Sequence, residues 1–130
     1  MRQLKILIID DEEGIVFLVQ KTYQKKGLVT CGASDGLTAV EVFKKERPDI
    51  TFIDIHMPFS AIDGIETLKR IKEIDENANC VMLTRIYDDN SIARTKALGA
   101  RHYITKPFEI EDLDKCIDEI KNQGDGSIVF

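Results

Sequence analysis

The stretch TFIDIHMPFSAIDG, residues 51–64, decides the fold of this chain. It starts as an apolar run typical of a buried strand and places an aspartate, Asp54, at the end of that run, just before a His-Met-Pro break. A carboxylate at the end of a buried strand costs free energy unless another group pairs with it. Asp54 therefore indicates where charged partners from other strands should gather.

Outward from this stretch, two kinds of segment alternate along the chain. Short β-branched and apolar runs predict strands over 4–10, 28–33, 49–55, 79–84 and 101–105. Apolar residues at helical spacing predict helices over 14–26, 36–46, 64–74, 89–98 and 109–121. Strict alternation with right-handed crossovers is typical of a parallel sheet covered on both faces. We expect an α/β fold of the flavodoxin-like (βα)5 type, doubly wound, with five parallel strands in the order 2-1-3-4-5.

Two of the expected helices have apolar faces of different width. The helix over 14–26 places Leu18 on its apolar stripe with Ile15 and Val19. The helix over 89–98 has the thinnest apolar face, which consists of Ile92, Ala93, Ala97 and Leu98. A helix with so little apolar surface is expected to be the least firmly packed and the most able to shift.

Size and composition limit the class of protein. The 130 residues suit one domain, and 43% apolar with 32% charged residues is ordinary for a soluble globular protein. The net charge of −5 argues against direct nucleic-acid binding. No apolar run is long enough for a membrane span and no signal peptide is recognisable, so we expect a cytoplasmic protein with no membrane partner. The three cysteines lack metal-binding spacing and read as small buried residues.

Polar residues collect at the predicted carboxyl ends of the strands, where doubly wound folds bind ligands. They are Asp10, Asp11, Asp54, Thr84 and Lys106. Taken singly, each of these residues could be a helix cap, a turn residue or a surface residue. Together they place three carboxylates, a hydroxyl and an ammonium at one edge of one sheet. All-oxygen ligands favour a hard divalent ion, Mg²⁺ above all with Mn²⁺ as the alternative, and a metal beside a lysine suits phosphoryl transfer to an aspartate.

The chain also resembles the receiver domain of bacterial two-component response regulators, most closely the single-domain receivers of chemotaxis and of sporulation phosphorelays. The resemblance covers about residues 4–121 and rests on the motifs IIDDEEGI, FIDIHMP, DGIE, MLT and LGARHYITKPF. It implies a receiver domain over residues 1–122, followed by a flexible tail or the start of a linker at 123–130. Whether the receiver stands alone or belongs to a longer regulator is left open.

The resemblance implies a role for each acidic residue. Asp54 would accept a phosphoryl group from a phosphohistidine on a sensor histidine kinase or a histidine phosphotransfer protein. Asp11 would bind Mg²⁺ directly and Asp10 through a water molecule. Asp54 and the backbone carbonyl of His56 would complete the ligands from the protein. Such a protein is a phosphoacceptor that assists its own phosphorylation and dephosphorylation rather than an enzyme.

The resemblance also implies a switch. Lys106 would pair with the phosphoryl oxygens, and the Lys106–Pro107 bond would be cis. Thr84 would move to hydrogen-bond the phosphoryl group, and Tyr103 would follow inward. This would repack the face formed by the fourth helix, the fifth strand and the fifth helix, which would meet an effector, an output domain or a second copy of the chain.

Several features depart from the family pattern. Arg85 replaces the small residue that usually follows the threonine, and either shields the site, adds a charge contact or points to solvent. His56 and Ile86 occupy the positions that tune attack by water, and an apolar Ile86 predicts slow self-dephosphorylation. The loop after Pro58 has two extra residues in FSAI, 59–62. These departures keep open the alternative of an interaction module that works without phosphorylation.

Overall fold

The computed structural model describes residues 3–85 and 88–123. Its strands are β1 (Lys5–Ile9), β2 (Val29–Ala33), β3 (Ile50–Asp54), β4 (Cys80–Thr84) and β5 (His102–Thr105). Its helices are α1 (Glu13–Lys25), α2 (Gly36–Glu46), α3 (Gly64–Ile74), α4 (Asp89–Ala97) and α5 (Ile110–Gln123). Every predicted element is therefore found, and its ends differ from the prediction by two residues at most.

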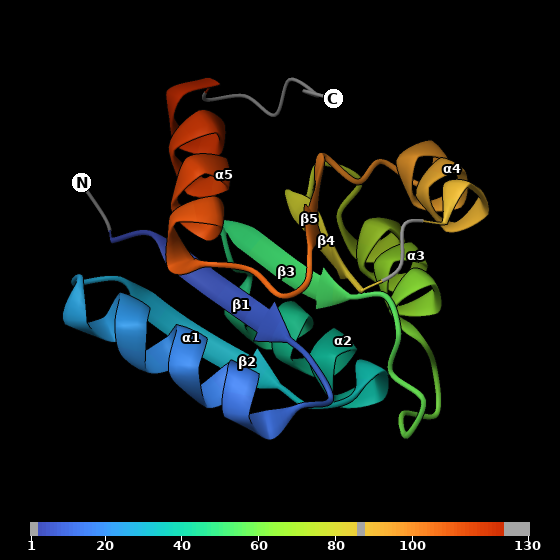
Figure 1. Cartoon of the computed structure of the whole chain (residues 1–130), viewed down its shortest axis with the longest axis horizontal. Coiled ribbons are helices and arrows are strands. Elements are labelled where there is room, and N and C mark those ends of the chain that lie inside the picture. Colours follow the sequence, from blue (N-terminus) through green and yellow to red (C-terminus); the bar gives the residue numbers. More distant parts are fainter. Residues whose placement is uncertain (1–2, 86–87, 124–130) are drawn as a thin grey trace.

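The five strands form one parallel sheet in the order β2-β1-β3-β4-β5, which confirms the predicted doubly wound topology. Helices α1 and α5 lie on one side of the sheet and α2, α3 and α4 on the other (Figure 1). The register sets the functional edge. Ile9 of β1 pairs with Ile53 of β3, so the next residues, Asp10 and Asp54, come side by side.

Side-chain alternation along the strands supplies a core on each face of the sheet. In β1, Ile6 and Ile8 pack toward α1 and α5, whereas Leu7 and Ile9 pack toward α2 and α3. All four side chains are fully buried. A strand buried on both faces has few polar positions, which is why β1, β3 and β4 read as near-continuous apolar runs. The three cysteines are free thiols, and burial raises the pKa of Cys80 to about 12.

Two expectations about helix faces were wrong. Leu18 was expected in the core, yet it is 54% exposed because Val19 and Tyr23 form the buried stripe of α1. Helix α4 does not pack through alanines. It buries Ser91 and Thr95, whose hydroxyls are satisfied by bonds to Asp88 and to the Ser91 carbonyl. Among the described residues, no helix is long and apolar enough to cross a membrane.

Candidate functional site

The predicted acidic residues meet at the carboxyl edge of the sheet. Carboxylate oxygens of Asp10, Asp11 and Asp54 all lie within 4.8 Å of one another. Asp10 and Asp54 are buried, at 0% and 1% exposure, while Asp11 is partly exposed toward solvent. Two buried carboxylates and one at the surface give a cation an entry path and an all-oxygen set of ligands.

Lys106 is the positive charge within this acidic cluster. It follows β5, and its Nζ lies 2.6 Å from Asp10 Oδ2 and 3.2 Å from Asp54 Oδ2. The same ammonium lies 3.7 Å from Glu12 Oε1. The Lys106 backbone N–H donates to the Thr84 carbonyl at 2.7 Å, and the Lys106–Pro107 peptide bond is cis. Lys106 thus offsets part of the negative charge of Asp10, Glu12 and Asp54.

The donor set fits a hard divalent ion. Asp10 Oδ2 is buried and accepts no well-aligned hydrogen bond from the described residues, so the charge of Lys106 alone compensates it. Its other oxygen, Oδ1, accepts the Glu12 backbone N–H at 2.9 Å. A buried carboxylate oxygen without a hydrogen bond is an energetic cost that a bound cation would remove. Asp10, Asp11 and Asp54 would hold such an ion.

The charges around Asp54 favour the binding of a cation. Burial and the neighbouring charge of Asp10 raise its pKa to about 7, although Lys106 and the His56 backbone N–H work in the opposite direction. That N–H donates to Asp54 Oδ1 at 3.2 Å. A nucleophile must be the carboxylate, and a nearby cation lowers the pKa of the acid and so favours that form.

Thr84 and Tyr103 lie on neighbouring strands with Tyr103 turned toward α4. Thr84 ends β4 and is 2% exposed, beside Asp54 on β3. The Tyr103 hydroxyl donates to the Ile92 carbonyl oxygen at 2.6 Å and also contacts Thr95 Oγ1. A displacement of Tyr103 therefore has to break contacts with α4. Ile86 lies outside the described residues.

Arg85 and Glu12 form an ion pair at the mouth of the site. The pair joins Arg85 Nη2 to Glu12 Oε1, and both residues line two neighbouring cavities. The larger cavity, about 700 Å³, lies between the β3–α3 loop and α4, and includes His56, Met57 and Phe59 in its lining. The smaller one, about 410 Å³, lies between α1 and the start of α5. Its lining comprises Glu12, Ile15, Leu18, Arg85, Lys106, Pro107 and Phe108.

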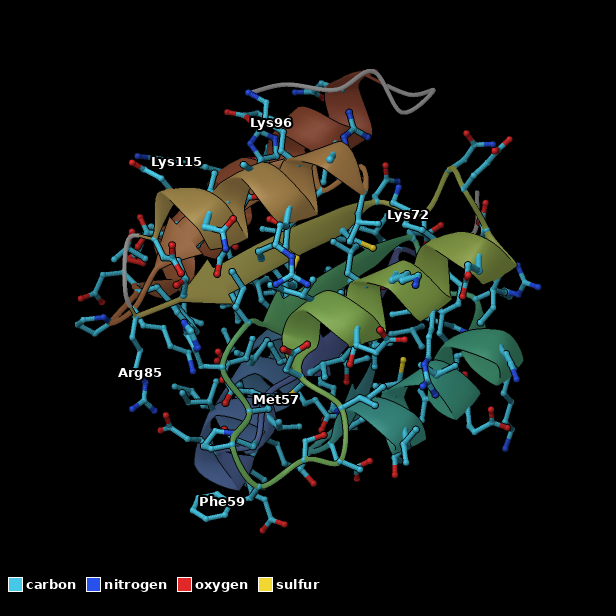
Figure 2. The ribbon with its side chains drawn as sticks, turned by 90° about the vertical axis from the view of Figure 1, so that its right-hand side faces the viewer. Met57, Phe59, Lys72, Arg85, Lys96 and Lys115 are labelled. Atoms are coloured by element: carbon cyan, nitrogen blue, oxygen red, sulfur yellow. The ribbon has the colours of Figure 1, made fainter. Side chains whose placement is uncertain are left out.

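The long loop after Pro58 is held in place by contacts that the sequence did not suggest. Ser60 Oγ accepts the Gly36 backbone N–H at 2.8 Å, which ties the loop to the first turn of α2. A Cβ on Gly36 would lie 2.3 Å from Thr67 Oγ1 and 2.5 Å from Ile62 Cγ1, so only glycine permits this approach. Phe59, next to the anchor, is 95% exposed. Figure 2 has Met57 and Phe59 on this loop, with Arg85 nearby.

The long loop ends in an Asp-Gly pair, and α3 begins at Gly64, the first residue of the helix predicted over 64–74. Asp63 caps α3 by accepting the Glu66 backbone N–H at 2.8 Å. Gly64 opens the helix against β3, and a Cβ there would lie 2.0 Å from the Asp54 carbonyl oxygen. The Asp-Gly pair therefore fixes the backbone around Asp54. Sequence reasoning missed Ser60, Gly36 and Glu12, because each acts through a contact that is distant in sequence or depends on side-chain direction.

Comparisons with known proteins agree with this geometry. A family model described as the response regulator receiver domain matches residues 6–118. Sporulation initiation phosphotransferase F of Bacillus subtilis is 41% identical, over 90% of this chain and 93% of that protein. The chemotaxis protein CheY of Halobacterium salinarum is 33% identical, over 89% of this chain and 95% of that protein. Among solved structures, CheY4 of Vibrio cholerae has a TM-score of 0.85 at 29% identity, covering 92% of this chain and 99% of its own.

Proposed function

This chain belongs to the response regulator receiver domains of two-component signalling, and we propose that Asp54 is its phosphoacceptor. Receiver domains are signalling modules rather than classical enzymes, and they bind Mg²⁺ in an acidic pocket. The observation that carries the proposal is the position of Lys106 Nζ, within 3.2 Å of Asp54 Oδ2 and 2.6 Å of Asp10 Oδ2. A cation beside an acidic cluster is the arrangement that phosphoryl transfer to a carboxylate requires.

Asp10, Asp11, Asp54 and the backbone carbonyl of His56 would hold the ion. Mg²⁺, with Mn²⁺ as the alternative, supplies neutralisation of the charge on the carboxylates and on the phosphoryl oxygens. In the transfer, an Asp54 carboxylate oxygen forms a bond to phosphorus, and the bond from phosphorus to the donor nitrogen breaks. Lys106 then faces the phosphoryl oxygens in place of the free carboxylate.

The donor would be a phosphohistidine on a sensor kinase or a phosphotransfer protein, partners that the family as a whole uses. The smaller cavity is a suitable place for the donor protein to dock, because Lys106 forms part of its wall and the rest is largely apolar. Leu18, exposed on α1, adds to that apolar surface. A partner that docks there would bring its histidine to the acidic cluster from the side of α1, and we expect the encounter in the cytoplasm.

Thr84 and Tyr103 would transmit the effect of phosphorylation to the surface of the protein. Thr84 would hydrogen-bond the phosphoryl group, and Tyr103 would give up its contacts with Ile92 and Thr95 as it moves inward. Because those contacts hold α4, the face of α4, β5 and α5 would change its shape for an effector, an output domain or a second copy of the chain. The residues 123–130 would serve as a tail or the start of a linker, and 124–130 lie outside the described residues.

A mass measurement tests the proposal. The protein is incubated with Mg²⁺ and acetyl phosphate or phosphoramidate, and the intact mass is expected to rise by one phosphoryl group. The gain should be absent in Asp54→Asn and unchanged in Asp35→Asn, which replaces the α2 cap with another good capping residue. A wild-type protein that takes up no phosphoryl group from either small donor or from a phosphohistidine protein would support the interaction module instead.

A further inference from the structure

One carboxylate oxygen connects two cations at the mouth of the site. Glu12 Oε1 pairs with Arg85 Nη2 and lies 3.7 Å from Lys106 Nζ. Lys106 Nζ in turn lies 3.2 Å from Asp54 Oδ2. The Arg85 guanidinium is thus linked to the proposed phosphoacceptor through one carboxylate, that of Glu12, and one ammonium, that of Lys106.

The Glu12 side chain takes part in this contact and does not cap its helix. It occupies the N-cap position of α1, where a side-chain oxygen normally accepts a backbone N–H, but its side chain makes no capping hydrogen bond. Its carboxylate is directed to Arg85 instead. The two residues line both cavities beside the acidic cluster, so the pair lies on the wall between them. Arg85 projects outward near the loop that carries Met57 and Phe59 (Figure 2).

The pair is easily exchanged. The two side chains are 59% and 44% exposed, and an ion pair so open to water contributes little stability. A phosphoryl group carries nearly two negative charges and presents three acceptor oxygens, and the planar guanidinium fork matches that geometry better than a lysine does. A phosphorylated Asp54 would therefore compete with Glu12 for Arg85.

We propose that the ion pair with Glu12 keeps Arg85 away from Asp54 before phosphorylation. Once Asp54 is phosphorylated, Arg85 leaves Glu12 and moves to the phosphoryl group. This rests on the proposed function and adds a ligand of the phosphoryl group to it. There the guanidinium covers the mouth through which water reaches phosphorus. In hydrolysis, a water oxygen bonds to phosphorus, the bond to the Asp54 oxygen breaks, and inorganic phosphate leaves. Arg85 slows this step and lengthens the life of the phosphorylated state.

The test compares five proteins with the wild type: Arg85→Ala, Glu12→Gln, the double variant, and two controls. The controls are Arg94→Ala, an arginine that lines the larger cavity without contacting Glu12, and Glu13→Gln, the acidic neighbour. Two quantities are measured: the rate at which the phosphoryl mass adduct on Asp54 decays, and the affinity for beryllium trifluoride in the presence of Mg²⁺.

Arg85→Ala should shorten the life of the adduct and weaken beryllium trifluoride binding by about three- to tenfold. Glu12→Gln should strengthen binding in the wild-type background and have a smaller effect when Arg85 is absent, because the released arginine carries the gain. Arg94→Ala and Glu13→Gln should leave both quantities near the wild-type values.

If the wild type forms the adduct, and Arg85→Ala has the same decay rate and the same affinity for beryllium trifluoride, this inference is overturned and the proposed function stays intact. A longer-lived adduct in Arg85→Ala also overturns it, since Arg85 would then promote hydrolysis. The absence of any Asp54 adduct in the wild type would overturn the proposed function itself.

Discussion

The hydroxyl of Tyr103 donates a 2.6 Å hydrogen bond to the backbone carbonyl oxygen of Ile92, and so joins β5 to α4. The same hydroxyl contacts Thr95 Oγ1, the fully buried polar residue on the inner face of α4. Helix α4 is therefore held largely by polar contacts rather than by an apolar stripe. Polar contacts of this kind can be exchanged without opening a cavity, which suits an element that has to move.

Tyr103→Phe keeps the ring and removes only the hydroxyl. We expect faster hydrogen exchange at the backbone amides of α4 and a loss of about 0.5–1.5 kcal/mol in the free energy of unfolding, because one hydrogen bond is lost. Helix α2, which packs against α3 and β2, serves as the internal reference in the same exchange experiment. Equal protection of α4 in both proteins would mean that the hydroxyl does not hold the helix.

Lys106→Met should have opposite effects on stability and on metal affinity. Removal of the ammonium leaves Asp10 and Asp54 buried without their cation, so the free energy of unfolding measured in urea should fall by about 3–5 kcal/mol. The same removal takes a positive charge away from the acidic cluster, so Mg²⁺ should bind more tightly in titration calorimetry. Lys115→Met, on the exposed face of α5, should change neither quantity. Weaker Mg²⁺ binding in Lys106→Met would contradict the assignment of these acids as the cation site.

The raised pKa of Asp54 predicts a dependence of stability on pH. The folded protein retains the Asp54 proton up to a pKa of about 7, whereas the unfolded chain releases it near 3.8. Unfolding between these values releases a proton, so the contribution of Asp54 to stability is full below the lower value and is lost as the pH rises through the higher one.

Asp54→Asn removes this dependence and leaves the other titrating groups in place. Without Mg²⁺, the variant should gain stability relative to the wild type as the pH rises from 5 to 8, by at least about 1 kcal/mol, since each unit of pKa corresponds to about 1.4 kcal/mol. Urea unfolding at several pH values measures the difference. A difference that stays constant with pH would show that Asp54 titrates normally in the folded state.

The sequence was sufficient for the fold and for the residues that the sheet itself positions. Asp10, Asp54 and Lys106 each lie at or directly after the end of a strand, and parallel pairing brings strand ends to one edge whatever the side chains are. The spacing of apolar residues along the chain was therefore enough to predict the strands, and with them the position of these three residues. The helix predicted over 64–74 begins at Gly64 as expected, because the cap at Asp63 and the close backbone approach at Gly64 are local requirements.

Contacts that depend on side-chain direction could not be predicted from the sequence. The apolar pattern of α4 gave the wrong buried face, since Ser91 and Thr95 can be buried once their hydroxyls bond to nearby oxygens. The sequence assigned no role to Glu12, whose turn toward Arg85 depends on where β4 ends. The anchor of the long loop joins residues 24 positions apart, and no local signal announces it.

The hydrogen bond between Ser60 and Gly36 should contribute to the stability of the fold. Ser60→Ala removes the acceptor of the Gly36 backbone N–H in a half-buried place, so the free energy of unfolding should fall by about 1 kcal/mol. Phe59→Ala is the matched control in the same loop, because its exposed ring should contribute less than about 0.5 kcal/mol. Both are compared by urea unfolding. If the loop merely lies on the surface, the two variants will have the same stability; if Ser60 ties it to α2, only Ser60→Ala will lose stability, and hydrogen exchange at the Gly36 amide will become faster.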